Sequence, residues 1–172
     1  MHATRIFFLF LALFFAACHH DDTSPSNSSI DIIQLKTYAT EPGSKAIVDG
    51  SVVLSDTFLV RYADILYYER ATHRFYLTPK ATAFLNGVGP EKLHGKTFAI
   101  AIDQKPLYTG YFWAAFSSSI CDWVYIDPIM LDGYNFIEVR LGYPWLSPEM
   151  QIPDKRNDAR LLDVLEADGK LR

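Results

Sequence analysis

The sequence predicts an α+β domain: a mainly antiparallel sheet of hairpins with two or three helices on one face. Three observations lead to this prediction. Short β-rich runs outnumber helical ones, most links between them are of hairpin length, and only two or three segments have the apolar spacing of a helix. The chain has 172 residues, of which 49% are apolar and 21% charged, so its composition suits one folded domain and excludes intrinsic disorder.

The strands are predicted from β-rich runs bounded by turn residues. These runs are residues 30–35, 51–54, 65–69, 74–78, 97–102, 107–113, 121–126 and 136–141. Four residues separate the third run from the fourth, and a turn at residues 103–106 follows the fifth, so two hairpins are expected. A further turn is expected at residues 41–44, and residues 56–63 fit either a strand or a loop.

A first helix is predicted directly after the first hairpin. Thr78 and Pro79 suit an N-cap and the first helical position. Gly87 and the pair Gly89-Pro90 are expected to stop the helix. The apolar residues between, at positions i, i+3, i+4 and i+7, are Ala81, Phe84, Leu85 and Val88.

A last helix is predicted near the end of the sequence. Asn157 or Asp158 is expected to cap it, and it runs to Ala167 with Gly169 closing it. A single helical turn is also expected at residues 147–149. The inward-facing side chains of the last helix are expected to be Leu161, Leu162 and Leu165.

Residues 1–17 have the pattern of a signal peptide. The apolar run at residues 6–17 would reach ~18 Å as a helix, which is short of a ~30 Å hydrocarbon core. It ends in Phe15-Ala16-Ala17-Cys18, which resembles the bacterial lipobox. That resemblance implies that Cys18 is acylated and becomes the mature N-terminus. The alternative is an ordinary secretory signal followed by an incidental cysteine.

The chain is therefore expected to have three parts: a signal peptide (1–17), a lipidated cysteine with a flexible polar tether (18–29), and one globular domain (30–172). The expected location is the cell envelope, on the periplasmic or surface side of a bacterial membrane, with the outer membrane favoured. Removal of residues 1–17 takes away one Arg and no acid, which shifts the net charge from −4 to −5. Acyl chains, rather than charge, would then hold the domain at the membrane.

The stretch from Arg74 to Ile126 resembles the periplasmic head subdomain of the SecD translocase subunit. The resemblance implies a fold and an extracytoplasmic interaction role, and no catalytic residue comes with it. Protein translocation is not implied, because no other segment here approaches ~18 consecutive apolar residues, whereas SecD has a bundle of membrane spans. The shared features are Leu77-Thr78-Pro79, a helix with Ala81 and Phe84, Gly95-Lys96, the strand from Phe98 to Asp103, Gln104-Lys105, and a late strand from Val124 to Ile126.

No catalytic, metal or cofactor motif is evident in the domain. An envelope hydrolase would use Cys121, or one of Ser117, Ser118 and Ser119, as nucleophile, with His73 or His94 as base, yet no nucleophile signature surrounds these residues. Neither histidine has a partner at metal-ligand spacing, and His19-His20-Asp21-Asp22 is expected to be solvated. We therefore expect no cofactor and no enzyme activity. The net charge of −4 also argues against a nucleic-acid partner.

Aromatic residues crowd the second hairpin and the strand that follows it. Their rings occupy both sides of the strand, so one set can be core while the other must be covered or must form an exposed binding face. Both interpretations remain open. The candidate binding residues, for an unknown envelope protein or ligand, are Tyr108, Tyr111, Trp113, Trp123 and Tyr125. The expected function is non-catalytic binding, and a purely structural module of a surface complex is a further alternative.

Overall fold

The computed structural model of the chain describes residues 26–172, so Cys18 and the predicted signal peptide lie outside the described residues. Short 3-10 helices occur at Asp49–Ser51, Tyr62–Asp64 and Pro128–Leu131. The strands and helices, in chain order, are β1 (Ile30–Thr37), β2 (Val53–Val60), β3 (Ile65–Glu69), β4 (Arg74–Leu77), α1 (Pro79–Val88), α2 (Pro90–Leu93), β5 (Thr97–Ile102), β6 (Lys105–Phe112), β7 (Cys121–Ile126), β8 (Phe136–Tyr143) and α3 (Ala159–Ala167).

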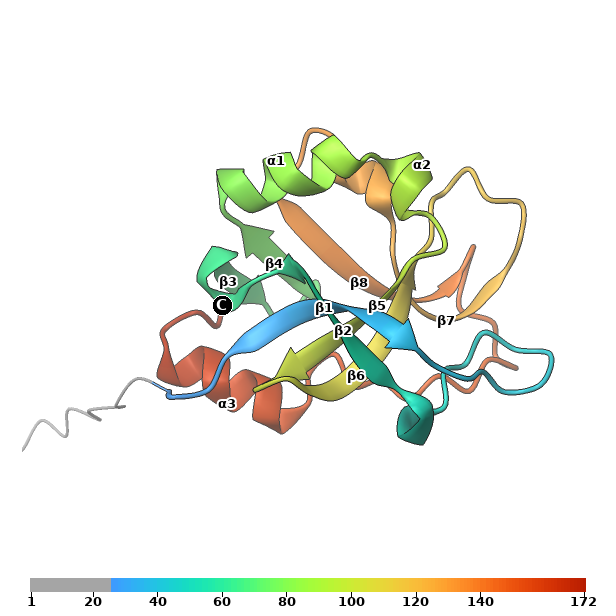
Figure 1. Cartoon of the computed structure of the whole chain (residues 1–172), viewed down its shortest axis with the longest axis horizontal. Coiled ribbons are helices and arrows are strands. Elements are labelled where there is room, and N and C mark those ends of the chain that lie inside the picture. The colour runs from blue at the N-terminus through green and yellow to red at the C-terminus, as the bar shows by residue number, and fades with distance from the viewer. Residues whose placement is uncertain (1–25) are drawn as a thin grey trace, which may run out of the picture.

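The strands form one eight-stranded sheet in the order β2-β1-β5-β6-β7-β8-β4-β3 (Figure 1). Every neighbouring pair is antiparallel except β6 and β7, which run parallel. That parallel ladder contains two residue pairs, Tyr111 with Tyr125 and Phe112 with Ile126. The predicted α+β class with a mainly antiparallel sheet is confirmed.

Both predicted hairpins are present. β3 and β4 pair across residues 70–73, and β5 and β6 pair across Asp103 and Gln104. Asp103 and Gln104 both have positive φ, 49° and 60°, as a two-residue turn that matches the twist of the strands requires. The ambiguous residues 56–63 continue β2 as far as Val60.

Helix α1 begins at Thr78-Pro79 and ends at Gly89-Pro90 as predicted, but Gly87 lies inside it. Thr78 is its N-cap, and the hydroxyl oxygen accepts a hydrogen bond from the backbone N–H of Ala81. Gly87 does not stop the helix, because a helix tolerates an interior glycine at a cost of about 1 kcal/mol. The helix ends at Gly89, whose φ of 83° breaks the helical path, and α2 starts at once from Pro90. Phe84, predicted to face inward, is 50% exposed.

Helix α3 also matches its prediction at the N-terminus. Of the two candidate caps, Asp158 is the one used, and its carboxylate accepts the N–H of Arg160 at 3.0 Å. Leu161 and Leu165 are fully buried, whereas Leu162 is only half-buried. The helical turn predicted at residues 147–149 is a simple turn in the structure.

The core has two parts, one on each side of the sheet. All three helices contribute to the larger part, where Leu85, Leu93 and Leu161 pack with β-strand residues such as Ile100 and Val139. The helices therefore cover one face, as predicted. The smaller part contains the side chains of Leu35, Ile47, Ala99, Tyr111, Trp113, Cys121 and Tyr125.

The chain ends of the described region are bound to the domain. Backbone hydrogen bonds join Tyr68 in β3 to Lys170 and Arg172, so the C-terminal residues cover that edge of the sheet. Upstream of β1, the N–H groups of Ser26 and Ser29 donate to carboxylates of the domain, at 2.7 and 2.8 Å. The domain therefore begins at least four residues before Ile30, the boundary predicted from sequence. Within residues 26–172, no helix is long and apolar enough to cross a bilayer.

Candidate functional site

The structure places four of the five candidate binding aromatics in the core. Tyr108, Tyr111, Trp113 and Tyr125 are between 4% and 6% exposed, and Trp123 is half-buried. Rings with so little accessible surface cannot form a docking face, so the binding role predicted for these four residues is not supported. Their burial instead matches the other interpretation, in which the rings on both sides of the sheet are core.

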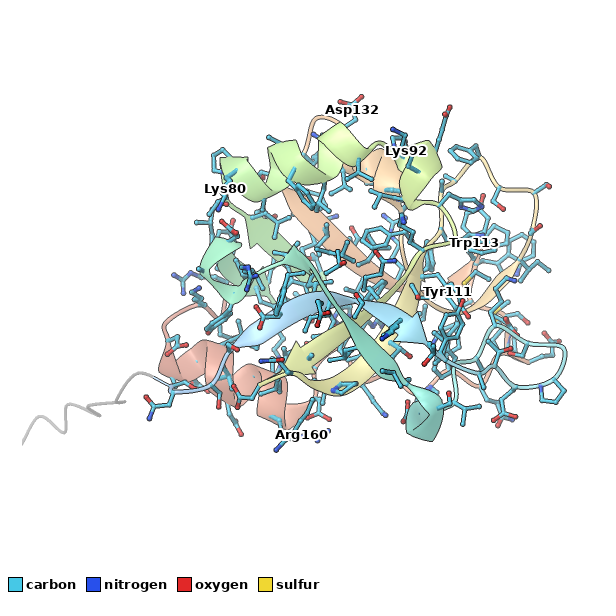
Figure 2. The ribbon with its side chains drawn as sticks, in the orientation of Figure 1. Lys80, Lys92, Tyr111, Trp113, Asp132 and Arg160 are labelled. Atoms are coloured by element: carbon cyan, nitrogen blue, oxygen red, sulfur yellow. The ribbon has the colours of Figure 1, made fainter. Side chains whose placement is uncertain are left out.

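A long loop covers the aromatic side chains on the outer face of the sheet. We call residues 38–48 the covering loop. It is held by Asp122, whose carboxylate accepts hydrogen bonds from the hydroxyl of Ser44 (2.6 Å) and the N–H of Lys45 (2.8 Å). The Lys45 ammonium lies 5.1 Å from the centre of the Trp113 ring, a cation–π contact. Tyr111 and Trp113 thus lie beneath this loop (Figure 2).

One aromatic side chain in the core keeps an unsatisfied polar atom. The hydroxyl of Tyr108 is buried among the residues of the larger core and has no hydrogen-bond partner within residues 26–172. Burial raises the pKa of this hydroxyl well above its ordinary value. A buried, unpaired hydroxyl costs about 1–3 kcal/mol of stability. Tyr108 therefore stabilises the core through the packing of its ring and not through a hydrogen bond.

Four of the ten exposed large apolar residues in the described part of the chain lie on two loops at one end of the sheet. One loop spans residues 113–120, between β6 and β7, and the other spans residues 144–151, after β8. We call the four residues concerned the apolar tip. They are Phe116 (56% exposed), Ile120 (59%), Trp145 (69%) and Leu146 (52%).

Hydrogen bonds hold the first loop of the tip against the end of β8, from which the second loop continues. Tyr143 at the end of β8 donates its hydroxyl to the carbonyls of Ala115 (2.8 Å) and Ser117 (3.2 Å), and its backbone pairs with Cys121 in β7. The Trp113 indole N–H donates to the carbonyl of Ser119 at 3.1 Å. A partner would therefore meet a first loop that is already ordered, which limits the entropy lost on binding.

The tip lies far from the point where the described chain begins. Figure 1 shows residue 26 at one end of the long axis, beside α3, while the covering loop and the two loops of the tip gather at the other end. Any attachment through residues upstream of 26 therefore leaves the tip on the distant side of the domain.

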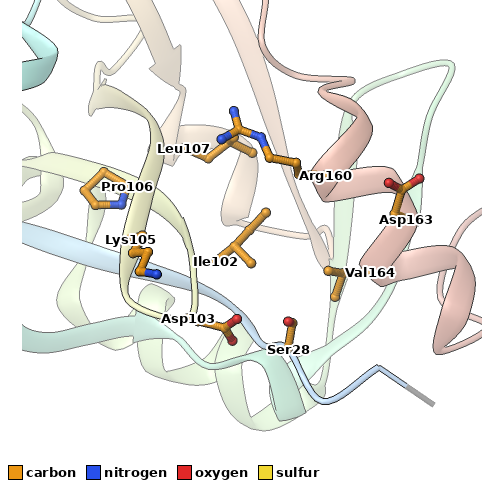
Figure 3. Close-up of a pocket in the computed structure, with 9 residues that line it drawn as sticks. All are labelled: Ser28, Ile102, Asp103, Lys105, Pro106, Leu107, Arg160, Asp163 and Val164. Carbon is orange, nitrogen blue, oxygen red and sulfur yellow. The ribbon is translucent and has the colours of Figure 1, made fainter. Parts of the chain in front are cut away.

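A separate groove lies between α3 and the β5–β6 hairpin (Figure 3). It has a volume of about 370 Å³ and an apolar floor that includes Ile102, Leu107 and Val164. Its rim carries two cations and two carboxylates, from Lys105, Arg160, Asp103 and Asp163. Arg160 extends over the groove in Figure 3, but its guanidinium is already paired with Asp158 at 2.9 Å. The opposite charges cancel, so the rim offers no net charge that would select a ligand.

The residues considered for catalysis do not form a reactive set. Cys121 is fully buried, and this burial raises the pKa of its thiol to about 11, so the thiol is protonated at neutral pH and shielded from substrate. His73 Nδ1 lies 3.3 Å from the Tyr68 hydroxyl, and His94 Nδ1 accepts the N–H of Ala114 at 3.1 Å. In the described part of the chain, no histidine or carboxylate is hydrogen-bonded to a hydroxyl of Ser117, Ser118 or Ser119. Residues 26–172 also contain no group of three or more potential metal ligands.

Comparison with known proteins gave no match: no family model, no curated protein and no solved structure is similar to this chain. Its function is therefore argued from its own residues.

Sequence reasoning did not single out Ile120 of the apolar tip, and it also missed Trp145 and Leu146. The latter two follow β8 in Pro144-Trp145-Leu146-Ser147-Pro148. Two large apolar side chains between prolines, outside any strand or helix pattern, are a signal for an exposed loop that could have been used. Phe116 follows the aromatic-rich second hairpin closely, but its exposure depends on the path of the loop that carries it.

Proposed function

We propose that this chain is an envelope lipoprotein, anchored through acylated Cys18, whose domain binds a protein partner and catalyses no reaction. The short apolar run that ends at Cys18 supports the anchor. The resemblance of residues 74–126 to the periplasmic head subdomain of SecD supports an interaction role outside the cytoplasm. The burial of Cys121 weighs against the hydrolase alternative.

The single observation that carries the binding role is the apolar tip. Four large side chains, each more than half exposed, lie on two loops that meet at Tyr143, whose hydroxyl bonds to the first loop and whose chain leads directly into the second. Soluble proteins expose scattered apolar residues singly, whereas a contiguous group of them marks an interaction site. A tryptophan at the most exposed position, Trp145, is the residue type most enriched among the energetic centres of interfaces.

The position of the tip favours a protein over the anchoring membrane as its partner. The eight residues from Cys18 to Ser26 span at most ~29 Å when fully extended. The described chain begins at the end of the domain opposite to the tip (Figure 1). Anchoring through Cys18 therefore places the tip away from the point of attachment, where another envelope protein can reach it.

The test uses the full chain in the membranes of cells that produce it. A photo-crosslinking amino acid replaces Leu146 in one variant and Phe84 in another, because these side chains are almost equally exposed, 52% and 50%, but lie on different elements. Crosslinks to one protein from position 146 and none from position 84 are expected. Co-purification of that protein should fall about 30-fold or more in the Trp145→Ser Leu146→Ser variant, because a central aromatic anchor contributes 2 kcal/mol or more. Phe84→Ser should leave it unchanged.

Several results would overturn the proposal. Equal recovery of the partner by the tip variant and the wild type would remove the binding role, and crosslinks from position 146 to lipid alone would make the tip a membrane contact. A mature protein whose N-terminal peptide, by mass spectrometry, begins at Met1 or carries an unmodified Cys18 would remove the anchor.

A further inference from the structure

A second surface feature adjoins the apolar tip. It is a hollow of about 460 Å³ between the covering loop, the start of β7 and the loop at residues 144–151. Of the described residues that line it, three are acids, Glu41, Asp122 and Glu149, and none is Lys or Arg. Trp123 and Met150 supply apolar wall. We call this feature the acidic hollow.

Hydrogen bonds favour the charged form of two carboxylates of the hollow, Asp122 and Glu149. Burial alone would raise the pKa of Asp122, but hydrogen bonds from Ser44 and from the N–H of Lys45 outweigh it, and the pKa lies below its ordinary value. The hydroxyl of Ser147 donates to Glu149 and lowers the pKa of that carboxyl as well. The hollow therefore carries negative charge at neutral pH.

The tip and the hollow adjoin each other along the chain at two points. Leu146 in the tip is followed at once by Ser147 in the wall of the hollow. Ile120 in the tip is two residues from Asp122. A peptide of three or four residues, at up to about 3.6 Å per residue, can cover Leu146 and still reach into the hollow.

Lys45, the cation beside the hollow, already packs against another part of the domain. Lys45 contributes to the low pKa of Asp122, but its ammonium lies over the Trp113 ring. Glu41 is exposed, and in the described part of the chain neither Glu41 nor Glu149 forms an ion pair with a Lys or Arg side chain. A cation from outside could therefore approach both carboxylates.

We propose that the partner docks with a basic and apolar segment, in which a Lys or Arg side chain enters the acidic hollow while apolar neighbours cover Trp145 and Leu146. This inference rests on the proposed function, and it names the chemistry of the partner. Charge complementarity carries it: an anionic surface beside an apolar one attracts a cationic segment and repels an acidic one. The same negative charge disfavours an anionic membrane surface or a nucleic acid as the occupant.

The experiment titrates the full chain, in neutral detergent micelles, with three tripeptides: acetyl-Leu-Lys-Leu-amide, acetyl-Leu-Glu-Leu-amide and acetyl-Ser-Lys-Ser-amide. The ¹⁵N-labelled indole groups are followed by NMR, because Trp145 reports on the tip and Trp123 on the hollow. Only the Leu-Lys-Leu peptide is expected to shift both signals. Raising the salt from about 0.1 M to about 1 M, which shortens the Debye length from ~10 Å to ~3 Å, should abolish its preference over Leu-Glu-Leu.

A matched pair of charge reversals completes the test. Glu149→Lys should weaken Leu-Lys-Leu binding about tenfold or more, the effect expected when an attractive charge becomes repulsive. Glu166→Lys, the same change on the exposed side of α3, should leave binding unchanged. If Leu-Glu-Leu shifts the Trp145 signal as strongly as Leu-Lys-Leu, the basic partner is wrong while the docking role of the tip stands. If none of the peptides shifts either signal, the inference also fails, and the crosslinking at position 146 decides whether the docking role fails with it.

Discussion

Gly110, in the middle of β6, is the residue at which one added methyl group should most disturb the sheet. A Cβ atom there would lie 2.6 Å from Cζ of Phe98 and 2.7 Å from the carbonyl oxygen of Val124, closer than real Cβ atoms approach. Phe98 is fully buried and packs edge-on against Phe112, so its ring has little room to move. The carbonyl of Val124 belongs to the backbone of β7 and can move only with that strand.

We expect Gly110→Ala to lower the free energy of unfolding by about 2 kcal/mol, within the 1–3 kcal/mol typical of overpacked cores. The parallel ladder between β6 and β7 consists of two residue pairs, Tyr111 with Tyr125 and Phe112 with Ile126, and it begins next to Gly110. With a urea m-value of about 2 kcal/mol per molar, the midpoint of urea unfolding should fall by about 1 M.

Gly87→Ala is the matched control for this measurement. Gly87 lies inside α1, and a Cβ atom added there meets nothing within 4 Å. Alanine is the better helix former, so this variant should gain about 0.5–1 kcal/mol. Both variants are unfolded in urea and followed by tryptophan fluorescence and circular dichroism. A midpoint for Gly110→Ala that is unchanged, or raised as for Gly87→Ala, would refute the packing argument.

Three further predictions concern the tip loop, the buried thiol and acid stability. Gly142→Ala should destabilise the fold by about 1–3 kcal/mol and change the tryptophan fluorescence, because its φ of 66° is strained for alanine and a Cβ would lie 3.0 Å from the backbone of Leu146. Gly169 has the same φ, but a Cβ there meets nothing within 4 Å, so Gly169→Ala measures the cost of the backbone conformation alone. Equal losses of stability in the two variants would contradict the predicted clash with Leu146. Cys121 should resist alkylation at pH 8 until urea unfolds the chain, since its pKa is raised to about 11; rapid labelling of the native protein would contradict its burial. The hydrogen bond from Arg156 lowers the pKa of Asp154 from 3.8 to about 2, so the ionised carboxyl stabilises the fold above pH 4 and this contribution is lost as the pH falls towards 2. Asp154→Asn should therefore reduce the free energy of unfolding at pH 7 but not near pH 2, and an equal loss at both pH values would show that Asp154 acts through something other than its charge.

Features whose signals lie within a few residues of one another could be predicted from the sequence. Thr78-Pro79 indicated the start of α1, and Asp158 was one of two candidate caps for α3. The turn at residues 103–106 indicated the β5–β6 hairpin. In each case a side chain or a turn acts on backbone groups two to four positions away, so the local sequence contains the whole interaction.

The candidate site was predicted only in part, because exposure depends on what covers a residue. Trp113 and Phe116 belong to one aromatic run, yet Trp113 is core and Phe116 is exposed. The difference comes from the covering loop, which Asp122 holds through Ser44, 78 residues away in the sequence. Nothing near Trp113 in the sequence indicates that contact.

The sequence by itself determined the α+β class, the positions of most strands and both capped helices, because these depend on local hydrogen bonding and on the spacing of apolar residues. It also contains the short apolar run ending at Cys18, from which the lipid anchor is proposed. The tertiary structure alone decided that β6 and β7 pair in parallel, that the covering loop buries Tyr111 and Trp113, and that the loops at residues 113–120 and 144–151 meet to form the apolar tip. These outcomes depend on contacts between segments distant in the chain, whose energies become favourable only once the sheet has brought the segments together.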